Sequence, residues 1–206
     1  MKLEKVPGIG ALALQKFHQQ KKYKIQDLEL QDMESLNNEA RLSLQYLDFH
    51  PFSRKEIDEV KKKFIKKHFR KWEICGSYRR KKKKMKDIDL LTTNSVLLKQ
   101  SKDLILIKNG NSRSRFFVRV SKRFVPVDLF VTPLHSWPFA LLHFTGSKEF
   151  NIKMRKKAQK KGCKLNEKEL ICNYNEMFPC NERFPFKTEN EIMLFVLGKI
   201  VPPEKR

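Results

Sequence analysis

Two short motifs are central to this chain: Trp72-Glu73-Ile74-Cys75-Gly76-Ser77-Tyr78-Arg79-Arg80, and then Asp87-Ile88-Asp89-Leu90-Leu91. Residues 72–75 and 87–91 each read as a short strand. Because side chains alternate between the faces of a strand, Asp87 and Asp89 point the same way. Two carboxylates on one face are unfavourable unless a cation lies between them, and oxygen ligands favour Mg²⁺ or Mn²⁺. The second motif therefore predicts a divalent metal site.

The turn at Gly76-Ser77 suits a phosphate group. At the start of a helix it offers backbone N–H groups and a hydroxyl, and Arg79 and Arg80 follow at once. A phosphate holder close to metal-binding acids is the layout of a nucleotidyl-transfer site. Each piece alone is common, since most Asp-x-Asp pairs are solvated strand ends, so the inference depends on the combination.

Positive charge dominates the composition. The 206 residues include 45 Lys and Arg against 23 Asp and Glu, a net charge of +22. Such an excess destabilises the compact state unless a polyanion is near, so nucleic acid is the expected partner and an anionic membrane surface the weaker alternative. An apolar fraction of 40% with 16 Phe argues against a disordered basic tail.

The sequence has no long apolar run, so we expect no membrane-spanning helix, no secretory signal and no membrane partner. The expected location is intracellular, in the nucleus or, for a viral protein, in the host cytoplasm or the virion. None of the cysteines is spaced for zinc, and all are expected to be reduced; they are Cys75, Cys163, Cys172 and Cys180.

The first third of the chain predicts short helices. Val6-Pro7-Gly8-Ile9-Gly10 is a tight turn before a helix from Ala11. Such hairpins bind a DNA phosphate through backbone groups, often with a monovalent cation between, although an ordinary turn has the same pattern. Residues 25–50 read as short helices, with a cap at Asn37 or Asn38. Ser53 and Glu56 form a capping box that opens a helix to about Phe69, whose apolar side is Ile57, Val60, Phe64 and His68.

The middle of the chain predicts strands. A basic loop, Lys81 to Lys84 with Lys86, suits nuclear import or DNA contact. Residues 95–103 read as a helix, 104–107 as a strand, 109–111 as a turn, and 116–120 and 124–131 as neighbouring strands. Asp128 is the only acid in its apolar strand and needs a partner. A metal shared with Asp87 and Asp89 would supply one.

Residues 136–161 read as two helices broken at Thr145-Gly146-Ser147. The second helix carries Lys148, Asn151 and Arg155 on one face, beside an expected apolar face of Phe150, Met154 and Ala158. The polar face suits base-pair or minor-groove contacts, and an ordinary surface stripe is the alternative. A final helix is expected from about Glu189 to Ile200.

In order and spacing, these motifs resemble those of family X DNA polymerases, of the polymerase beta type, over nearly the whole chain. The resemblance implies an α+β fold: a helix-hairpin-helix DNA-binding subdomain at 1–51, a catalytic palm with a mixed β-sheet at 52–134, and a small nucleotide-selecting subdomain at 135–206. It implies a monomeric DNA-directed DNA polymerase that takes primer-template or gapped DNA and dNTPs, for short-gap filling in base excision repair. The family's N-terminal lyase domain has no counterpart here, so we expect no sugar-phosphate lyase activity.

The resemblance also implies roles for single residues. Asp87 and Asp89 would bind both Mg²⁺ ions, with Mn²⁺ as a substitute, while Asp128 would bind the catalytic ion and help to deprotonate the primer 3′-hydroxyl. Ser77 and Arg80 would hold the triphosphate, and the other nucleotide contacts would be His143, Phe144, Gly146, Lys148, Asn151 and Arg155. DNA would be bound by Gly8, Gly10 and Arg155, and a monovalent cation by the backbone carbonyls around Glu4, Val6 and Ile9.

Three positions depart from the family pattern. His143 replaces a Tyr, Lys148 replaces an Asp that meets the incoming base, and Pro126 stands where a basic residue usually supports the third acid. Two rival functions remain open. One is a template-independent or RNA-adding nucleotidyltransferase, against which the hairpin, Asn151 and Arg155 argue. The other is a non-catalytic DNA-binding protein, against which the presence of all three acids argues.

Overall fold

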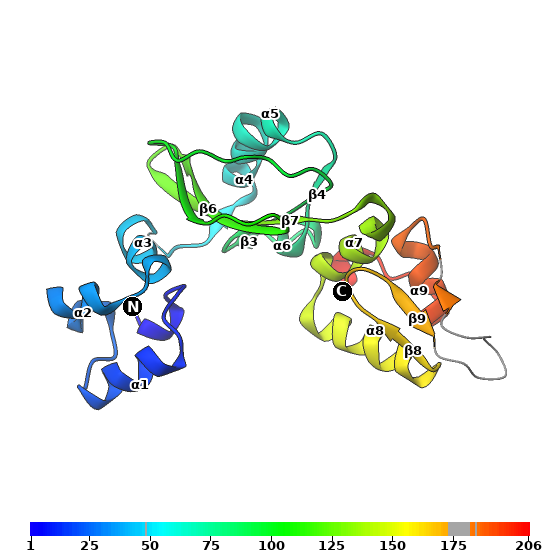
Figure 1. Cartoon of the computed structure of the whole chain (residues 1–206), viewed down its shortest axis with the longest axis horizontal. Helices are drawn as coiled ribbons and strands as arrows, with labels where there is room; N and C mark the ends of the chain where they lie inside the picture. The colour runs from blue at the N-terminus through cyan, green and yellow to red at the C-terminus, as the bar shows by residue number, and fades with distance from the viewer. Residues whose placement is uncertain (48, 173–181, 184) are drawn as a thin grey trace.

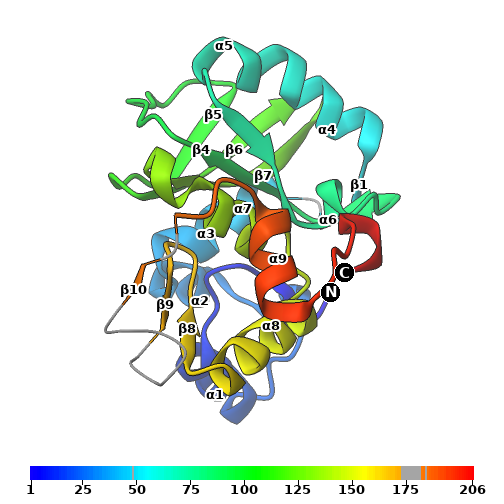
Figure 2. The same ribbon diagram turned by 90° about the vertical axis from the view of Figure 1, so that its right-hand side faces the viewer.

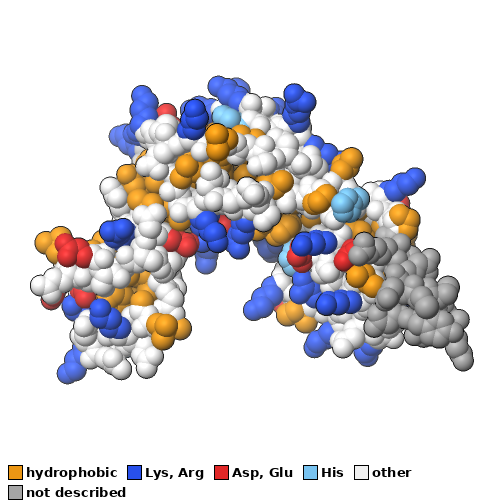
Figure 3. Space-filling model, in the orientation of Figure 1, with side chains coloured by type: hydrophobic (Ala, Val, Ile, Leu, Met, Phe, Trp, Pro, Cys, Tyr) orange, Lys and Arg blue, Asp and Glu red, His pale blue; other side chains and the backbone are white. Residues whose placement is uncertain are grey.

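The computed structural model describes residues 1–47, 49–172, 182–183 and 185–206, and these form an arch with three parts in chain order (Figure 1). Each part has its own hydrophobic cluster, built from residues 3–49, 52–131 and 139–201 respectively. Figure 3 shows a hollow between the two ends of the arch, with Lys and Arg side chains on the underside of the middle part. The arch thus presents a basic concave side.

The first part is helical. It contains α1 (Ala11–Gln19), α2 (Leu30–Ser35), α3 (Asn38–Tyr46) and the 3₁₀ turns η1 (Leu3–Lys5) and η2 (Ile25–Asp27). Asn37 caps α3 by accepting a hydrogen bond from the Ala40 amide at 2.9 Å, and its amide donates to the Gly8 carbonyl at 2.6 Å. Gly8 has a φ of +89°, and an added Cβ would lie 2.5 Å from the Ala40 nitrogen. Only glycine lets the predicted hairpin pack this closely on α3.

The middle part is built on a mixed sheet. The described residues form a five-stranded sheet in the order β2-β4-β7-β6-β5, where β4 and β7 are parallel and the other pairs antiparallel. The strands are β2 (Trp72–Ile74), β4 (Ile88–Thr92), β5 (Leu104–Lys108), β6 (Arg113–Val120) and β7 (Arg123–Val131). The expected α+β class with a mixed sheet is confirmed.

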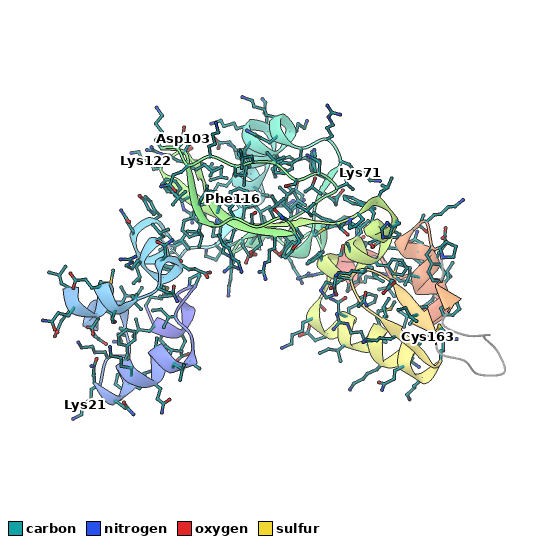
Figure 4. The ribbon with its side chains drawn as sticks, viewed as in Figure 1. Lys21, Lys71, Asp103, Phe116, Lys122 and Cys163 are labelled. Carbon is teal, nitrogen blue, oxygen red and sulfur yellow. A yellow bond between two sulfur atoms is a disulfide. The ribbon has the colours of Figure 1, made fainter. Side chains whose placement is uncertain are left out.

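One face of the sheet is covered by a long helical segment, α4 (Arg54–Val60), the π-helical η3 (Lys61–Ile65) and α5 (Lys66–His68) (Figure 2). The predicted capping box is present, since the Ser53 amide donates to Glu56 at 2.8 Å and the Ser53 hydroxyl accepts from the Glu56 amide. The core of this layer includes Phe116 of β6 (Figure 4). A small sheet pairs β1 (Phe52–Ser53) with β3 (Lys84–Met85), and α6 (Gly76–Arg79) follows β2.

The last part packs helices on a small sheet. It contains η4 (Leu134–Ser136), α7 (Trp137–Thr145), α8 (Lys148–Lys160), β8 (Cys163–Leu165), β9 (Leu170–Cys172), β10 (Glu182–Arg183), α9 (Glu189–Leu197) and η5 (Pro203–Lys205). Phe150, Met154 and Ala158 of α8 are buried in its cluster, as predicted. Arg79 of α6 binds Glu189 of α9 at 2.7 Å and the Thr145 hydroxyl of α7 at 2.7 Å, and so ties this part to the middle one.

Three predictions about helices are wrong. Residues 95–103 form no helix, because the segment alternates: Val96 and Leu98 pack on the core while Leu97 and Lys99 are exposed, the period of extended chain rather than of a helix. His68 is exposed, because the π turn of η3 shifts the phase of the helix and buries Ile65 and Phe69. The final helix stops at Leu197, three residues early, because Gly198 adopts the left-handed conformation of a C-cap.

The expectation of reduced cysteines is wrong for one pair. Cys163 and Cys172 form a disulfide, because the β8–β9 pairing sets them directly opposite each other with their Cα atoms 3.9 Å apart. Cys163 is labelled in Figure 4. Cys75 is free and buried, and Cys180 lies outside the described residues. No helix in the described ranges has the length and apolar character needed to cross a membrane.

Candidate active site

The sheet brings the three predicted acids to one face. Asp89 on β4 and Asp128 on β7 are register partners in the parallel pair. Their strand neighbours Ile88, Leu90 and Leu129 point into the core beneath the helical layer. Because side chains alternate, the two acids point to the opposite, concave side, and Asp87 precedes Asp89 by two residues on the same face.

The Gly76 turn lies directly against one of these acids. The Cys75 amide donates to the Asp89 carbonyl at 2.8 Å, which fixes the end of β2 beside β4. Gly76 then turns into α6 with a φ of +52°, and an added Cβ would lie 2.0 Å from Oδ2 of Asp89. The position therefore requires glycine, both for its backbone conformation and for the space that the carboxylate occupies.

The three acids are crowded, with Asp87 and Asp89 half-buried and Asp128 buried. Burial raises the pKa of Asp89 to about 7, and the charges of Asp87 and Asp128 add to the effect. Burial, and then Asp128, likewise raises the pKa of Asp87. A divalent cation bound between these oxygens would reverse both penalties, so the donor set fits Mg²⁺ or Mn²⁺. Within the described ranges, however, no three Asp, Glu, His or Cys side chains already form a group that could hold a metal.

Asp128 is engaged by arginines instead. Arg115 on β6 donates from Nε to Oδ1 at 2.8 Å and from Nη2 to Oδ2 at 2.6 Å, a two-pronged pair, and Arg113 Nη2 lies 3.3 Å from Oδ1. The partner that we predicted for this buried acid was a metal, and the observed partner is an arginine. Arg115 also binds Glu39 of α3. Arg115 thus supports the third acid, as the basic residue that Pro126 replaces usually does, but it does so from the neighbouring strand.

Sequence reasoning missed Arg113 and Arg115. The signal was present: Arg113 and Arg115 alternate directly before the strand predicted at 116–120, next to the strand of Asp128. The structure extends that strand back to Arg113 and so puts both cations on one face. The register that sets Arg115 opposite Asp128 comes from the β6–β7 hairpin and could not be fixed from composition.

A cavity of about 700 Å³ joins the acids to α7 and α8. Every residue predicted to contact the nucleotide lines it together with Asp87 and Asp89; these are Ser77, Arg80, His143, Phe144, Gly146, Lys148, Asn151 and Arg155. Lys84, Met85, Lys86 and Ile152 line it as well and were not predicted. Side chains from residues 76 to 155 therefore surround this one basic cavity beside the acids.

Arg80 is held at the wall of this cavity. Its Nη1 donates to the Thr145 carbonyl at 2.5 Å, while its Nε is buried and has no hydrogen-bond partner among the described residues. Gly146, with a φ of +68°, leaves room for it, since a Cβ there would lie 3.0 Å from Nη1. A buried guanidinium N–H without a partner is costly, and an anion in the cavity is a suitable acceptor.

The α7–α8 side of the cavity is also ordered by hydrogen bonds. The Asn151 amide donates to the His143 carbonyl at 2.8 Å, and Arg155 Nη2 lies 3.4 Å from His143 Nδ1. Burial lowers the pKa of His143, and the charge of Arg155 adds to this, so the ring is neutral at physiological pH. Phe144 stacks on Phe130 of β7 with ring centroids 4.0 Å apart.

The N-terminal hairpin reaches the acids from the other side. A second cavity, of about 390 Å³, is lined by Glu4, Lys5 and Pro7 together with Asp87, Arg115 and Asp128. Val6 and Ile9 are buried, and the Val6 carbonyl accepts a hydrogen bond from the Ile9 amide at 3.2 Å. The hairpin thus lies beside the acids, while the cation predicted for its carbonyls stays a prediction.

Comparison with known proteins shows which proteins this chain is similar to. The family model described as the DNA polymerase beta thumb matches residues 140–206, the stretch that supplies His143 to Arg155. A protein named Repair DNA polymerase X from African swine fever virus (isolate Tick/South Africa/Pretoriuskop Pr4/1996) is 34% identical over 108 residues, which cover 48% of this chain and 62% of the viral protein. The chain is a relative of the family X DNA polymerases.

Other relatives extend the comparison. Repair DNA polymerase X of the Badajoz 1971 Vero-adapted strain is 33% identical over 108 residues. The DNA polymerase/3'-5' exonuclease PolX of Bacillus subtilis (strain 168) is 28% identical over 158 residues, 74% of this chain but 26% of the bacterial protein. The chain spans less than two thirds of the length of these family X relatives.

Proposed function

We propose that the chain is a DNA-directed DNA polymerase that adds dNTPs to a primer 3′-hydroxyl in short gaps in DNA. One observation carries the proposal: a single cavity is lined by two crowded carboxylates and by an arginine whose buried Nε–H has no partner among the described residues. Acids that favour a divalent cation and a donor that favours an anion are what an Mg²⁺–nucleoside triphosphate requires.

Asp87, Asp89 and Asp128 would hold two Mg²⁺ ions, which would activate the 3′-hydroxyl and neutralise the leaving pyrophosphate. Around them, Arg80 and the Ser77 turn would bind the triphosphate, and Gly146 would lie against the sugar. His143 and Phe144 would line the pocket for the sugar. The neutral ring of His143 can accept a hydrogen bond from the sugar. These side chains position the reacting groups, and positioning with charge stabilisation dominates phosphoryl-type transfer.

The three parts of the arch would divide the work. Residues 1–51 would grip DNA at Gly8 and Gly10, with a monovalent cation at the carbonyls around Glu4, Val6 and Ile9. Residues 52–134 would be the catalytic palm, and 135–206 would select the nucleotide through Lys148, Asn151 and Arg155. The excess of 45 Lys and Arg over 23 Asp and Glu supports a polyanionic partner.

The test is primer extension across a one-nucleotide gap with Mg²⁺, for the unmodified protein and for Asp128→Asn. The substitution keeps the shape but removes charge, so we expect a loss of about three or more orders of magnitude in rate with little loss of DNA affinity. DNA binding is measured in parallel. Equal extension by both proteins would refute the assigned site. If neither protein extends the primer although both bind DNA tightly, the chain is a non-catalytic DNA-binding protein.

A further inference from the structure

We propose that Arg115 is a positioning residue for the catalytic acid Asp128, and that Glu39 of the N-terminal helices holds Arg115 in place. The acid would then be tied to the part of the chain that binds DNA. This inference rests on the proposed function, since it assigns Asp128 to the catalytic group.

The geometry at Asp128 is specific. Arg115 contacts both carboxylate oxygens, at 2.8 and 2.6 Å, from a residue directly opposite in the β6–β7 register. Asp128 is only 6% exposed, so water does little to set its orientation. A planar fork on both oxygens fixes the rotation of a carboxylate in a way that a single hydrogen bond does not. Arg115 therefore decides where the lone pairs of Asp128 point.

Glu39 connects this pair to the N-terminal part. It lies in α3, one residue after the start of the helix, and binds Nη1 of Arg115. The cap of the same helix, Asn37, donates to the Gly8 carbonyl in the hairpin at 2.6 Å. A continuous series of contacts thus runs from Gly8 through Asn37, Glu39 and Arg115 to Asp128. Binding of a DNA phosphate at the hairpin would act on α3, and through Glu39 on the acid.

The charge of Arg115 should affect metal affinity and extension rate in different ways, and this difference distinguishes a positioning role from a structural one. A guanidinium bonded to Asp128 opposes a divalent cation at the same carboxylate, while the fixed orientation favours the productive arrangement. Loss of Arg115 should therefore leave metal affinity unchanged or higher, yet lower the rate at saturating metal. Ordinary structural damage would lower both.

The chain offers a matched control. Arg123 on β7 binds Glu56 of α4, and the side chains of that pair are 26% and 28% exposed, against 30% and 32% for Arg115 and Glu39. Both are partly buried Arg–Glu pairs that join the sheet to a helix, but no described contact links Glu56 to the acids. Because Glu56 also accepts hydrogen bonds from Ser53 at the start of α4, Glu56→Gln should cost at least as much stability as Glu39→Gln and still leave activity unchanged.

The experiment compares the unmodified protein with Arg115→Gln, Arg115→Lys, Glu39→Gln, Glu56→Gln and the double variant Arg115→Gln with Glu39→Gln. Three quantities are measured: Mn²⁺ affinity by electron paramagnetic resonance without DNA, the single-turnover extension rate at saturating Mn²⁺, and thermal unfolding. We expect Arg115→Gln to bind Mn²⁺ at least as tightly as the unmodified protein and to extend primers roughly 10- to 100-fold more slowly. Arg115→Lys should regain part of that rate, because it restores the charge but not the fork.

Glu39→Gln should slow extension by a smaller factor, Glu56→Gln should not, and the double variant should be no slower than Arg115→Gln alone. The proposal is overturned if Arg115→Gln weakens Mn²⁺ binding along with rate and stability, if Glu39→Gln behaves like Glu56→Gln, or if the two substitutions act additively. If the unmodified protein binds Mn²⁺ but extends no primer, the proposed function fails, and the Mn²⁺ affinities still test Arg115. If it binds no Mn²⁺, both proposals fall.

Discussion

Replacement of Asp89 by Asn should change how the metal-free protein responds to pH. Burial, with the charges of Asp87 and Asp128, raises the pKa of Asp89 from 3.8 to about 7. The shift is about three units, each worth about 1.4 kcal/mol. Because the folded-state pKa is raised, the stabilisation is complete below about pH 4 and is lost as the pH rises through about 7. Between about pH 5 and about pH 8 the loss from this group is between about 2 and 3 kcal/mol.

The assay is urea denaturation with a chelator present, at about pH 5 and about pH 8. The Asp89→Asn variant has no charge to bury, so it should lose less stability over this range than the unmodified protein and should be the more stable of the two at the higher pH. Added Mg²⁺ should restore the unmodified protein and not the variant. Asp103→Asn, in an exposed segment far from the acids, is the control and should behave like the unmodified protein. Equal pH dependence for the unmodified protein and Asp89→Asn would show that burial of the Asp89 carboxylate does not control stability in this range.

Three further predictions concern single side chains. Gly76→Ala would set a Cβ 2.0 Å from Asp89 and should abolish extension and lower stability by about 1–3 kcal/mol. Gly10→Ala, whose Cβ would meet no described atom within 4 Å, should leave stability nearly unchanged in thermal unfolding. Arg80→Gln should raise the KM for dNTP roughly 10- to 100-fold in steady-state extension, because a charged hydrogen-bond donor is lost, and an unchanged KM would show that the triphosphate binds elsewhere. Ser53→Ala removes the cap of α4 and should lower the unfolding free energy by about 1 kcal/mol while activity is kept; a large loss of activity would contradict a purely structural cap.

The acids could be predicted because their pattern is local. Asp87 and Asp89 stand at the start of one apolar strand, and period-two alternation puts them on one face. Asp128 stands out as the only acid of its own apolar strand, and the parallel β4–β7 pairing brings it to the same face. The Gly76 turn, the Ser53 cap and the break at Gly146 are likewise set by neighbouring residues. The resemblance to family X polymerases then supplied the cavity residues, which the structure brings together.

What could not be predicted depends on register and packing. Arg115 meets Asp128 only because the β6–β7 hairpin pairs them, and it meets Glu39 only because α3 lies at the edge of the sheet. Cys163 and Cys172 meet through the β8–β9 register, which their spacing alone does not specify. The segment at 95–103 has residues that tolerate a helix, but tertiary contacts of Val96 and Leu98 hold it extended.

Templated nucleotide addition at Asp87, Asp89 and Asp128 can be tested directly. The most direct measurement uses four one-nucleotide-gapped duplexes that differ only in the templating base, each with Mg²⁺ and one dNTP at a time. We expect the complementary dNTP to give the fastest extension on every template and Asp128→Asn to remove that extension. Extension by all four dNTPs regardless of the template would contradict the claim and identify a template-independent nucleotidyltransferase.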